Sequence, residues 1–154
     1  MTKKYELVDA GCNFWFNDND RMRSPFPRSI QPELKERATQ ELVRWVRDFS
    51  KEDRETIEDE EMISMFEMFL FSEALKLVEN EPDNLDLMMT INYPMLPRLG
   101  DTMSDEAHAE STIVRRTLRE EQVENEKKKK VFVVLHLKNE ASDKEWMTEA
   151  ELPT

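Results

Sequence analysis

Residues 131–138 read VFVVLHLK. Successive side chains of a strand point to opposite faces. The odd-numbered positions of this stretch are all valine or leucine, and the even-numbered positions include Phe132, Val134 and His136. A strand that is apolar on both faces is typical of a sheet interior. The stretch therefore predicts an inner strand with His136 on the same face as Phe132 and Val134.

The flanking sequence predicts further strands. Residues 112–121 are suited to a strand that forms a hairpin with the first, joined by the long, charged segment 122–130. Residues 85–91 carry apolar side chains at every second position, which is the strand periodicity. Near the N-terminus, residues 5–9 and the aromatic residues 14–16 predict extended structure, with a turn at Ala10-Gly11 between them.

Two helices are expected between these strands. The apolar residues that follow Pro32 are spaced by three and four, which places them on one helix face. A second helix is expected from a cap at Ser50 or Thr56 to about Asn80, because Pro82 cannot continue it.

The order of these elements predicts an α+β fold. We expect an antiparallel sheet of about four to five strands with two main helices packed on one face. Ser142 and Glu145 have the spacing of a capping box, which predicts a short C-terminal helix. Because neither a repeat nor a domain boundary is evident, residues 1–154 are expected to form a single domain.

The composition argues against several kinds of site. The 154 residues include two glycines, one cysteine and two histidines. A phosphate-binding loop needs several glycines, and a structural zinc site needs four Cys or His ligands. We therefore expect no cofactor, no metal and no enzymatic activity. A single cysteine, Cys12, cannot form an internal disulfide, which favours a reducing, cytoplasmic location.

The net charge of −12 is concentrated in the middle of the chain. Residues 31–80 carry a net charge of −7 and residues 81–110 carry −6. This excess disfavours nucleic acids and anionic membranes as partners. The basic run Lys127–Lys130 lies among glutamates that cancel most of its charge, so we expect it to be a solvated hairpin loop.

Two segments have the residue types of a metal site. Residues 17–20 are rich in side-chain oxygens but lack the glycine and glutamate that a calcium loop requires. Glu106, His108 and Glu110 would point the same way on a strand and could then bind a metal. On a loop they would be solvated polar residues, which is the interpretation we favour.

A pocket near His136, Trp15 and the 93–97 loop is one alternative function. His136 could act there as a general base, although neither an orienting group nor a substrate is evident. The favoured interpretation is a histidine at the edge of the core. Cys12 lies near aromatic residues and is expected to be a small buried residue rather than a nucleophile.

The segment 62–71 is the strongest candidate for a contact surface. Only Ser64 and Glu67 are polar, so the segment is apolar around most of a helix. It either fills the core or binds a partner, and methionine suits a surface that repacks. The partner-binding candidates are Met62, Met65, Phe66, Met68, Phe69 and Phe71.

The sequence thus favours an acidic, cytoplasmic, non-enzymatic protein that acts through protein–protein contacts and self-associates. One alternative is the small-molecule-binding protein or enzyme with the His136 pocket. A second is an acidic inhibitor or nucleic-acid mimic that binds a basic partner through residues 52–61 and 101–110.

Overall fold

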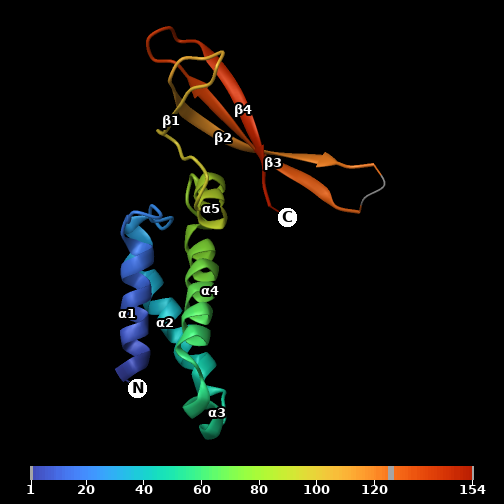
Figure 1. Cartoon of the computed structure of the whole chain (residues 1–154). Coiled ribbons are helices and arrows are strands. Elements are labelled where there is room, and N and C mark those ends of the chain that lie inside the picture. Colours follow the sequence, from blue (N-terminus) through green and yellow to red (C-terminus); the bar gives the residue numbers. More distant parts are fainter. Residues whose placement is uncertain (1, 125–126, 154) are drawn as a thin grey trace. The chain divides into compact units, whose positions relative to one another are not determined.

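The computed structural model describes residues 2–124 and 127–153, with side chains from residue 5 onward. The chain forms two compact units, Met1–Met95 and Leu96–Thr154. The first is helical and the second contains the sheet (Figure 1). The elements are α1 (Thr2–Phe16), the 3-10 helix η1 (Arg28–Ile30), α2 (Gln31–Arg47), α3 (Lys51–Thr56), α4 (Asp59–Val78), α5 (Asn84–Asn92), β1 (Thr102–Met103), β2 (Ser111–Gln122), β3 (Lys129–Lys138) and β4 (Glu145–Glu151).

The α+β class and the antiparallel sheet of four strands are confirmed. The strand order is β1-β2-β3-β4, so the VFVVLHLK stretch lies on an inner strand, as predicted. The hairpin of β2 and β3 is also confirmed, with Gln122 opposite Lys129 at its closed end. Whether residues 1–154 behave as a single domain stays a prediction. No described helix combines the length and the apolar character that a membrane span requires.

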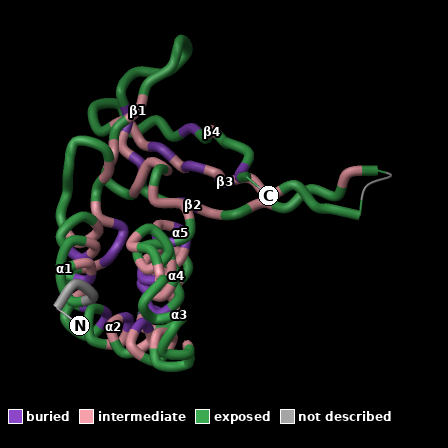
Figure 2. The backbone as a smooth tube through the Cα atoms, turned by 60° about the horizontal axis from the view of Figure 1, so that its bottom comes forward, coloured by how far each residue is buried: buried purple, intermediate pink, exposed green. Residues whose placement is uncertain are grey.

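Helices α2 and α4 form the centre of the helical unit. Leu34, Ala38 and Leu42 recur every four residues on α2 and are fully buried. On α4 the buried residues follow the same spacing: Phe66, Leu70, Ala74 and Val78. Figure 2 shows these buried segments facing the interior of the helical unit. Residues at this spacing share one helix face, so each helix contributes one apolar stripe to the core.

The expected extended structure at residues 5–9 and 14–16 is wrong, because this segment is helix α1. Val8 and Cys12 are buried four residues apart, and they bring α1 against the helical core. Gly11 lies inside the helix and not in a turn. A Cβ at Gly11 would lie 3.0 Å from Cδ2 of Phe66, so the missing side chain lets α1 and α4 approach closely.

The expected strand at residues 85–91 is also wrong, because these residues lie in helix α5. Ile91 is fully buried, whereas Leu85 is 76% exposed although a strand would place both on one face. Leu87 and Met88 pack against the core that contains Ile91. Their spacing of three and four residues from Ile91 is that of a helix.

The expected second helix is divided into α3 and α4 by an extended residue, Ile57. The predicted cap is confirmed at Ser50, whose side chain accepts a hydrogen bond from the amide of Asp53 at 3.1 Å. This bond satisfies one amide that has no partner within the helix.

The expected C-terminal helix is wrong, because residues 145–151 form β4. The residues before β4 form a turn instead of a helix start. Oδ1 of Asn139 accepts hydrogen bonds from the amides of Ala141 and Ser142 in this turn. Asp143 has a φ of 56°, which completes the turn between β3 and β4. Trp146 then pairs with Leu137.

Candidate functional site

The outer edge of β2 carries backbone amide and carbonyl groups that point away from the sheet. In an antiparallel sheet, alternate residues of a strand direct both backbone polar groups to the same neighbour. The amide of Leu152 donates to the carbonyl of Val131 at 2.8 Å, so the odd residues of β3 face β4. The even residues of β3 therefore face β2. With Val134 opposite Thr117, the even residues of β2 after its bulge point outward.

The beginning of this edge is occupied. Ile113 exchanges backbone hydrogen bonds with Gly100 and Asp101, and β1 pairs with Ser111 and Thr112. Among the described residues no strand covers β2 beyond this point. The backbone groups of Leu118 and Glu120 thus face outward from the sheet.

The hairpin of β2 and β3 extends beyond the neighbouring strands. The last pair between β3 and β4 is Phe132 with Glu151, while the pairing of β2 with β3 continues to Gln122 and Lys129. Figure 1 shows these two strands continuing past β4 as a two-stranded arm. An extended arm with an uncovered edge is available to pair with another strand.

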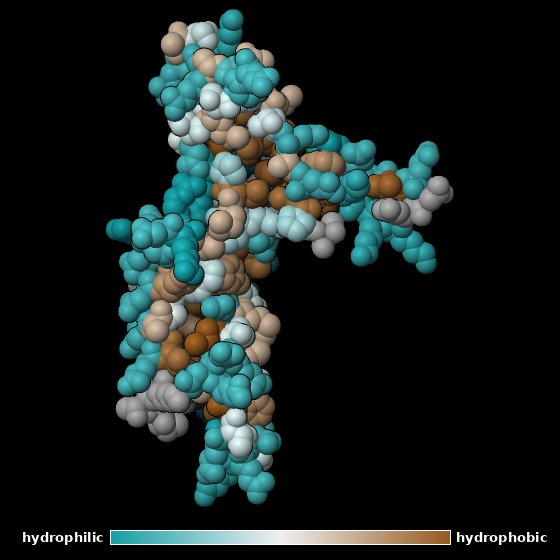
Figure 3. Space-filling view, in the orientation of Figure 1, coloured by the Kyte–Doolittle hydropathy of each residue, from teal (hydrophilic) through white to brown (hydrophobic). Residues whose placement is uncertain are grey.

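One face of the sheet, the closed face, is centred on Val133, Leu135 and Leu137, which are all buried. Leu118 lies on this face opposite Val133, yet it is 55% exposed because it ends the row at the uncovered edge. Figure 3 shows apolar surface over the sheet. An apolar side chain beside an unpaired backbone edge gives a partner strand both kinds of contact.

The other face, the open face, carries Phe132, Val134 and His136, which are half-buried. The prediction that β3 is an inner strand is confirmed, but the side chains on its open face are only half-buried. Arg119 of β2 crosses β3 to reach Glu149 of β4, with Nη2 2.8 Å from Oε1 and Nε 3.0 Å from Oε2. Its guanidinium also lies 4.3 Å from the ring centroid of Phe132. The hydrogen bonds from Arg119 lower the pKa of Glu149.

His136 lies in a surface depression of about 590 Å³ on the sheet unit. Arg115, Glu145 and Met147 line it, together with residues 114, 137 and 146. Nδ1 of His136 is 3.3 Å from Nη2 of Arg115, and Nε2 is 3.2 Å from Oγ1 of Thr117. The imidazole thus contacts a polar group at each nitrogen. Neither of these two groups is a carboxylate that could orient the imidazole as a base.

The other members of the proposed pocket lie in the helical unit or at its end. Trp15 belongs to α1, and its ring packs edge-on against Phe71 with centroids 4.9 Å apart. The Nε1 atom of Trp15 is buried without an acceptor among the described residues. Pro94 and Met95 line a separate shallow hollow of about 260 Å³ with residues 19–23. His136 and Trp15 thus belong to different units.

The candidate metal ligands around His108 have other roles. Nδ1 of His108 lies 2.9 Å from the carboxylate Oδ1 of Asp105, which is the acceptor of this hydrogen bond. The His108 ring stacks on Trp146 with centroids 4.3 Å apart. Trp146 in turn donates from Nε1 to Oγ of Ser111 at 2.9 Å. Glu106 and Glu110 are exposed. Within residues 2–124 and 127–153, no three His, Cys, Asp or Glu side chains gather as metal ligands.

The oxygen-rich residues 17–20 form a turn. Oδ1 of Asn19 accepts hydrogen bonds from the amides of Arg21 and Met22. Oδ1 of Asp18 accepts one from the amide of Ser24 at 2.9 Å. These oxygens cap backbone amides, which is the ordinary role of Asn and Asp in turns.

The partner-binding candidates of α4 are unequal in exposure. Phe66 is buried in the helical core, and Met62, Met65, Phe69 and Phe71 are half-buried. Met68 is 53% exposed. Most of the run therefore fills the core of the helical unit, and Met68 is the member with the most accessible surface.

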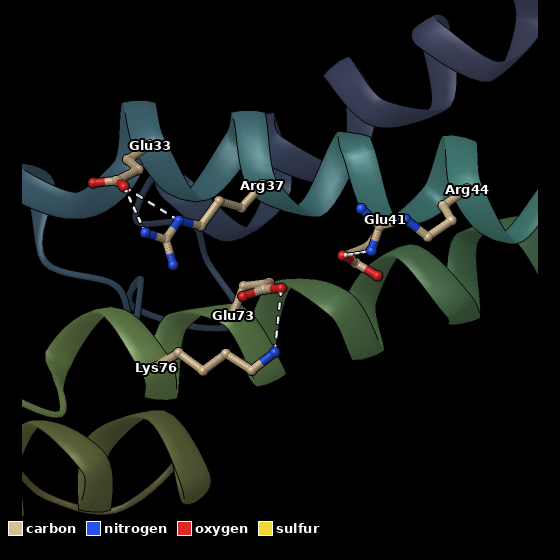
Figure 4. Close-up of polar contacts among 6 residues, drawn as sticks. All are labelled: Glu33, Arg37, Glu41, Arg44, Glu73 and Lys76. Carbon is tan, nitrogen blue, oxygen red and sulfur yellow. Dashed lines mark hydrogen bonds and ion pairs between the residues drawn. The ribbon is translucent and has the colours of Figure 1, made fainter.

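Charged residues of the helical unit are engaged locally. Figure 4 shows Glu33 with Arg37 and Glu41 with Arg44, both pairs at 2.8 Å on α2. Glu73 is buried on α4 with Nζ of Lys76 3.4 Å away. The acidic residues 52–61 span α3 and the start of α4, whereas residues 101–110 belong to the sheet unit. The proposed acidic surface therefore has members in both units.

Cys12 is buried, as expected from sequence, and the lysine run is exposed but lies only partly in a loop. Burial raises the pKa of the Cys12 thiol to about 11, which leaves little nucleophilic thiolate at neutral pH. Lys127–Lys130 are exposed, but Lys129 and Lys130 belong to β3 and not to the expected loop. Lys129 lies 3.5 Å from Glu120.

Sequence reasoning missed the uncovered β2 edge. The charges of β2 change sign along the strand, from Arg115 and Arg116 to Glu120 and Glu121, but this order does not by itself mark an uncovered edge. No protein family, no curated protein and no solved structure matches this chain.

Proposed function

We propose that this chain acts through protein–protein contacts and self-associates. The observation that carries the proposal is the uncovered outer edge of β2, with Leu118 55% exposed beside it. Water solvates such an edge when the chain is alone, and a second strand replaces that water with backbone hydrogen bonds. The acidic charge of the chain, −12, disfavours nucleic acid as the partner.

Mass in solution tests this function. Light scattering on the eluting full chain, across a concentration series from micromolar to several hundred micromolar, is expected to show a mass rising above that of one 18.4 kDa chain. A constant mass of one chain across the series would contradict self-association.

A second candidate function is binding of a small molecule on the open face. The depression of about 590 Å³ beside His136 favours it, since ligand sites have volumes of a few hundred to about a thousand Å³. A thermal-shift screen of small acids and amines tests it. A compound that raises the melting temperature of the wild type but not of His136→Ala would support this function, and no response to any compound would oppose it.

A further inference from the structure

We propose that two copies of this chain pair antiparallel through the outer edges of their β2 strands, with Leu118 opposite Leu118 of the second copy. The inference rests on the proposed function and specifies its partner and its surface. The pairing would join two sheets of four strands into one continuous sheet.

The backbone geometry permits this register. In an antiparallel pair, residues whose polar groups point to the partner must lie opposite one another. Leu118 points outward and would meet itself on the two-fold axis. Glu120 also points outward and would lie opposite position 116 of the second copy. Arg116 is buried there and donates from Nη1 to the carbonyl of Pro97 at 3.1 Å, so the register is argued from Leu118 and from the pairs on the open face. The interface is thus self-complementary, as a two-fold dimer requires.

The charges favour this register over its neighbours. Arg115 of each copy faces Glu121 of the other on the open face, and both residues are exposed. A slip of two residues in one direction would put Arg119 opposite Arg119. A slip in the other direction would put Arg115 opposite Arg119. Like charges directly opposite each other are destabilising, so the proposed register is the one of the three that avoids them.

The apolar row across the closed face becomes continuous in the same register. Leu118 pairs with Val133, and Val133 pairs with Ala150. Placing Leu118 against its copy extends this row through both sheets and removes the exposed leucine side chains from water.

The other edge of the sheet is unsuited to the same contact. Since Val133 and Leu135 face β4, the residues of β4 that point outward are Glu145, Met147, Glu149 and Glu151. Two such edges would oppose glutamates in every nearby register, which disfavours pairing of β4 with β4.

A cross-link at residue 118 tests the proposal. Paired residues with exchanged hydrogen bonds have Cα atoms about 5.5 Å apart, within the range that a disulfide spans. Leu118→Cys should give a covalent dimer on mild oxidation or with a short bis-maleimide. The wild type, whose one thiol is the buried Cys12, should not. Met147→Cys is the matched control, exposed on the outer edge of β4.

The possible results distinguish the proposed β2 pairing from self-association in general, on which the pairing rests. A dimeric mass with equal or faster cross-linking of Met147→Cys would overturn the β2 pairing and leave self-association standing. A mixture of the two variants that yields mainly the 118–147 product would show head-to-tail pairing of β2 with β4 instead. A constant monomer mass would overturn both proposals.

Charge reversal provides a second, independent test of the register. Arg115→Glu and Glu121→Arg should each weaken dimerisation by about tenfold or more, because two attractive pairs become repulsive. An equimolar mixture of these variants should dimerise again, since every opposed pair is then of opposite charge. Glu140→Arg, in the exposed turn after β3, is the control and should dimerise like the wild type. A mixture that stays as weak as each variant alone would overturn the register.

Discussion

Arg119 and Glu149 are joined by two hydrogen bonds of 2.8 and 3.0 Å across the intervening strand β3. The residues are 30 positions apart and belong to strands that do not pair with each other. A bidentate arginine–carboxylate pair has a fixed geometry. The pair therefore holds β4 in place relative to β2 on the open face.

This pair predicts a pH dependence of stability. Because Arg119 lowers the pKa of Glu149, ionisation of this carboxyl group is more favourable in the folded chain than in the unfolded chain. The stabilisation is present above the unfolded pKa of about 4.3 and is lost as the pH falls through the lower folded value. Glu149→Gln should be less stable than the wild type at pH 7 and equally stable at pH 3, as measured by urea unfolding. Glu151→Gln, an exposed control on the same strand, should show no such difference; a constant Glu149→Gln deficit at both pH values would contradict the linkage.

The hydrogen bond from Trp146 to Ser111 predicts a loss of stability. Both residues are buried, so Ser111→Ala would remove the hydroxyl that accepts the hydrogen bond from the indole Nε1. We expect the free energy of unfolding to fall by about 1–3 kcal/mol. In a Trp146→Phe background, which has no indole donor, the same substitution should cost clearly less. Equal costs in the two backgrounds would contradict the role of the bond.

The contact of Gly11 with Phe66 predicts a coupled effect. Alanine is a better helix former than glycine by about 1 kcal/mol. At Gly11, however, the new Cβ would lie 3.0 Å from the buried Phe66 ring, and overpacking costs about 1–3 kcal/mol. Gly11→Ala should therefore fail to stabilise the wild type but should stabilise a Phe66→Leu variant. Thermal unfolding of the four proteins measures this; the same gain in both backgrounds would show that the ring yields freely.

The Cys12 thiol predicts a protection pattern. It is buried, and burial raises its pKa to about 11. Alkylation by iodoacetamide at pH 8 should therefore be slow in buffer and fast in 6 M urea, as followed by mass spectrometry. Rapid alkylation of the folded chain would mean that α1 leaves the core readily.

The parts that sequence predicted are those in which local pattern and tertiary environment agree. The β2–β3 hairpin has apolar residues at the strand period, and Leu34, Ala38 and Leu42 have the helical period. Ser50 also caps its helix as predicted, because a capping bond depends only on nearby residues.

The segments whose predicted structure was wrong have sequences compatible with two kinds of local structure. In α5, residues at every second position are apolar, but Leu87, Met88 and Ile91 also satisfy the helical spacing, and packing selected it. In α1, Gly11 predicts a turn unless the position of the Phe66 ring is known. Before β4, Ser142 and Glu145 match a capping box, but Oδ1 of Asn139 accepts a hydrogen bond from the amide of Ser142 in a turn. Only the tertiary structure decides among these patterns.

The candidate site follows the same division. The position of His136 beside Phe132 and Val134 follows from strand alternation and could be predicted. The uncovered β2 edge could not be predicted, because it depends on β1, the strand that pairs with that edge, being only two residues long. The residues around β1 carry no clear signal that it ends at Met103.

The most direct measurement of the central claim is sedimentation equilibrium on the full chain beside two single substitutions. Leu118→Lys places two like charges on the proposed axis, whereas Met68→Lys changes an exposed residue of α4 that is 53% accessible. The account predicts a dimer of 18.4 kDa chains for the wild type and for Met68→Lys, and a monomer for Leu118→Lys. A wild type that remains a monomer at several hundred micromolar, or a Leu118→Lys variant that dimerises as tightly as the wild type, would contradict it.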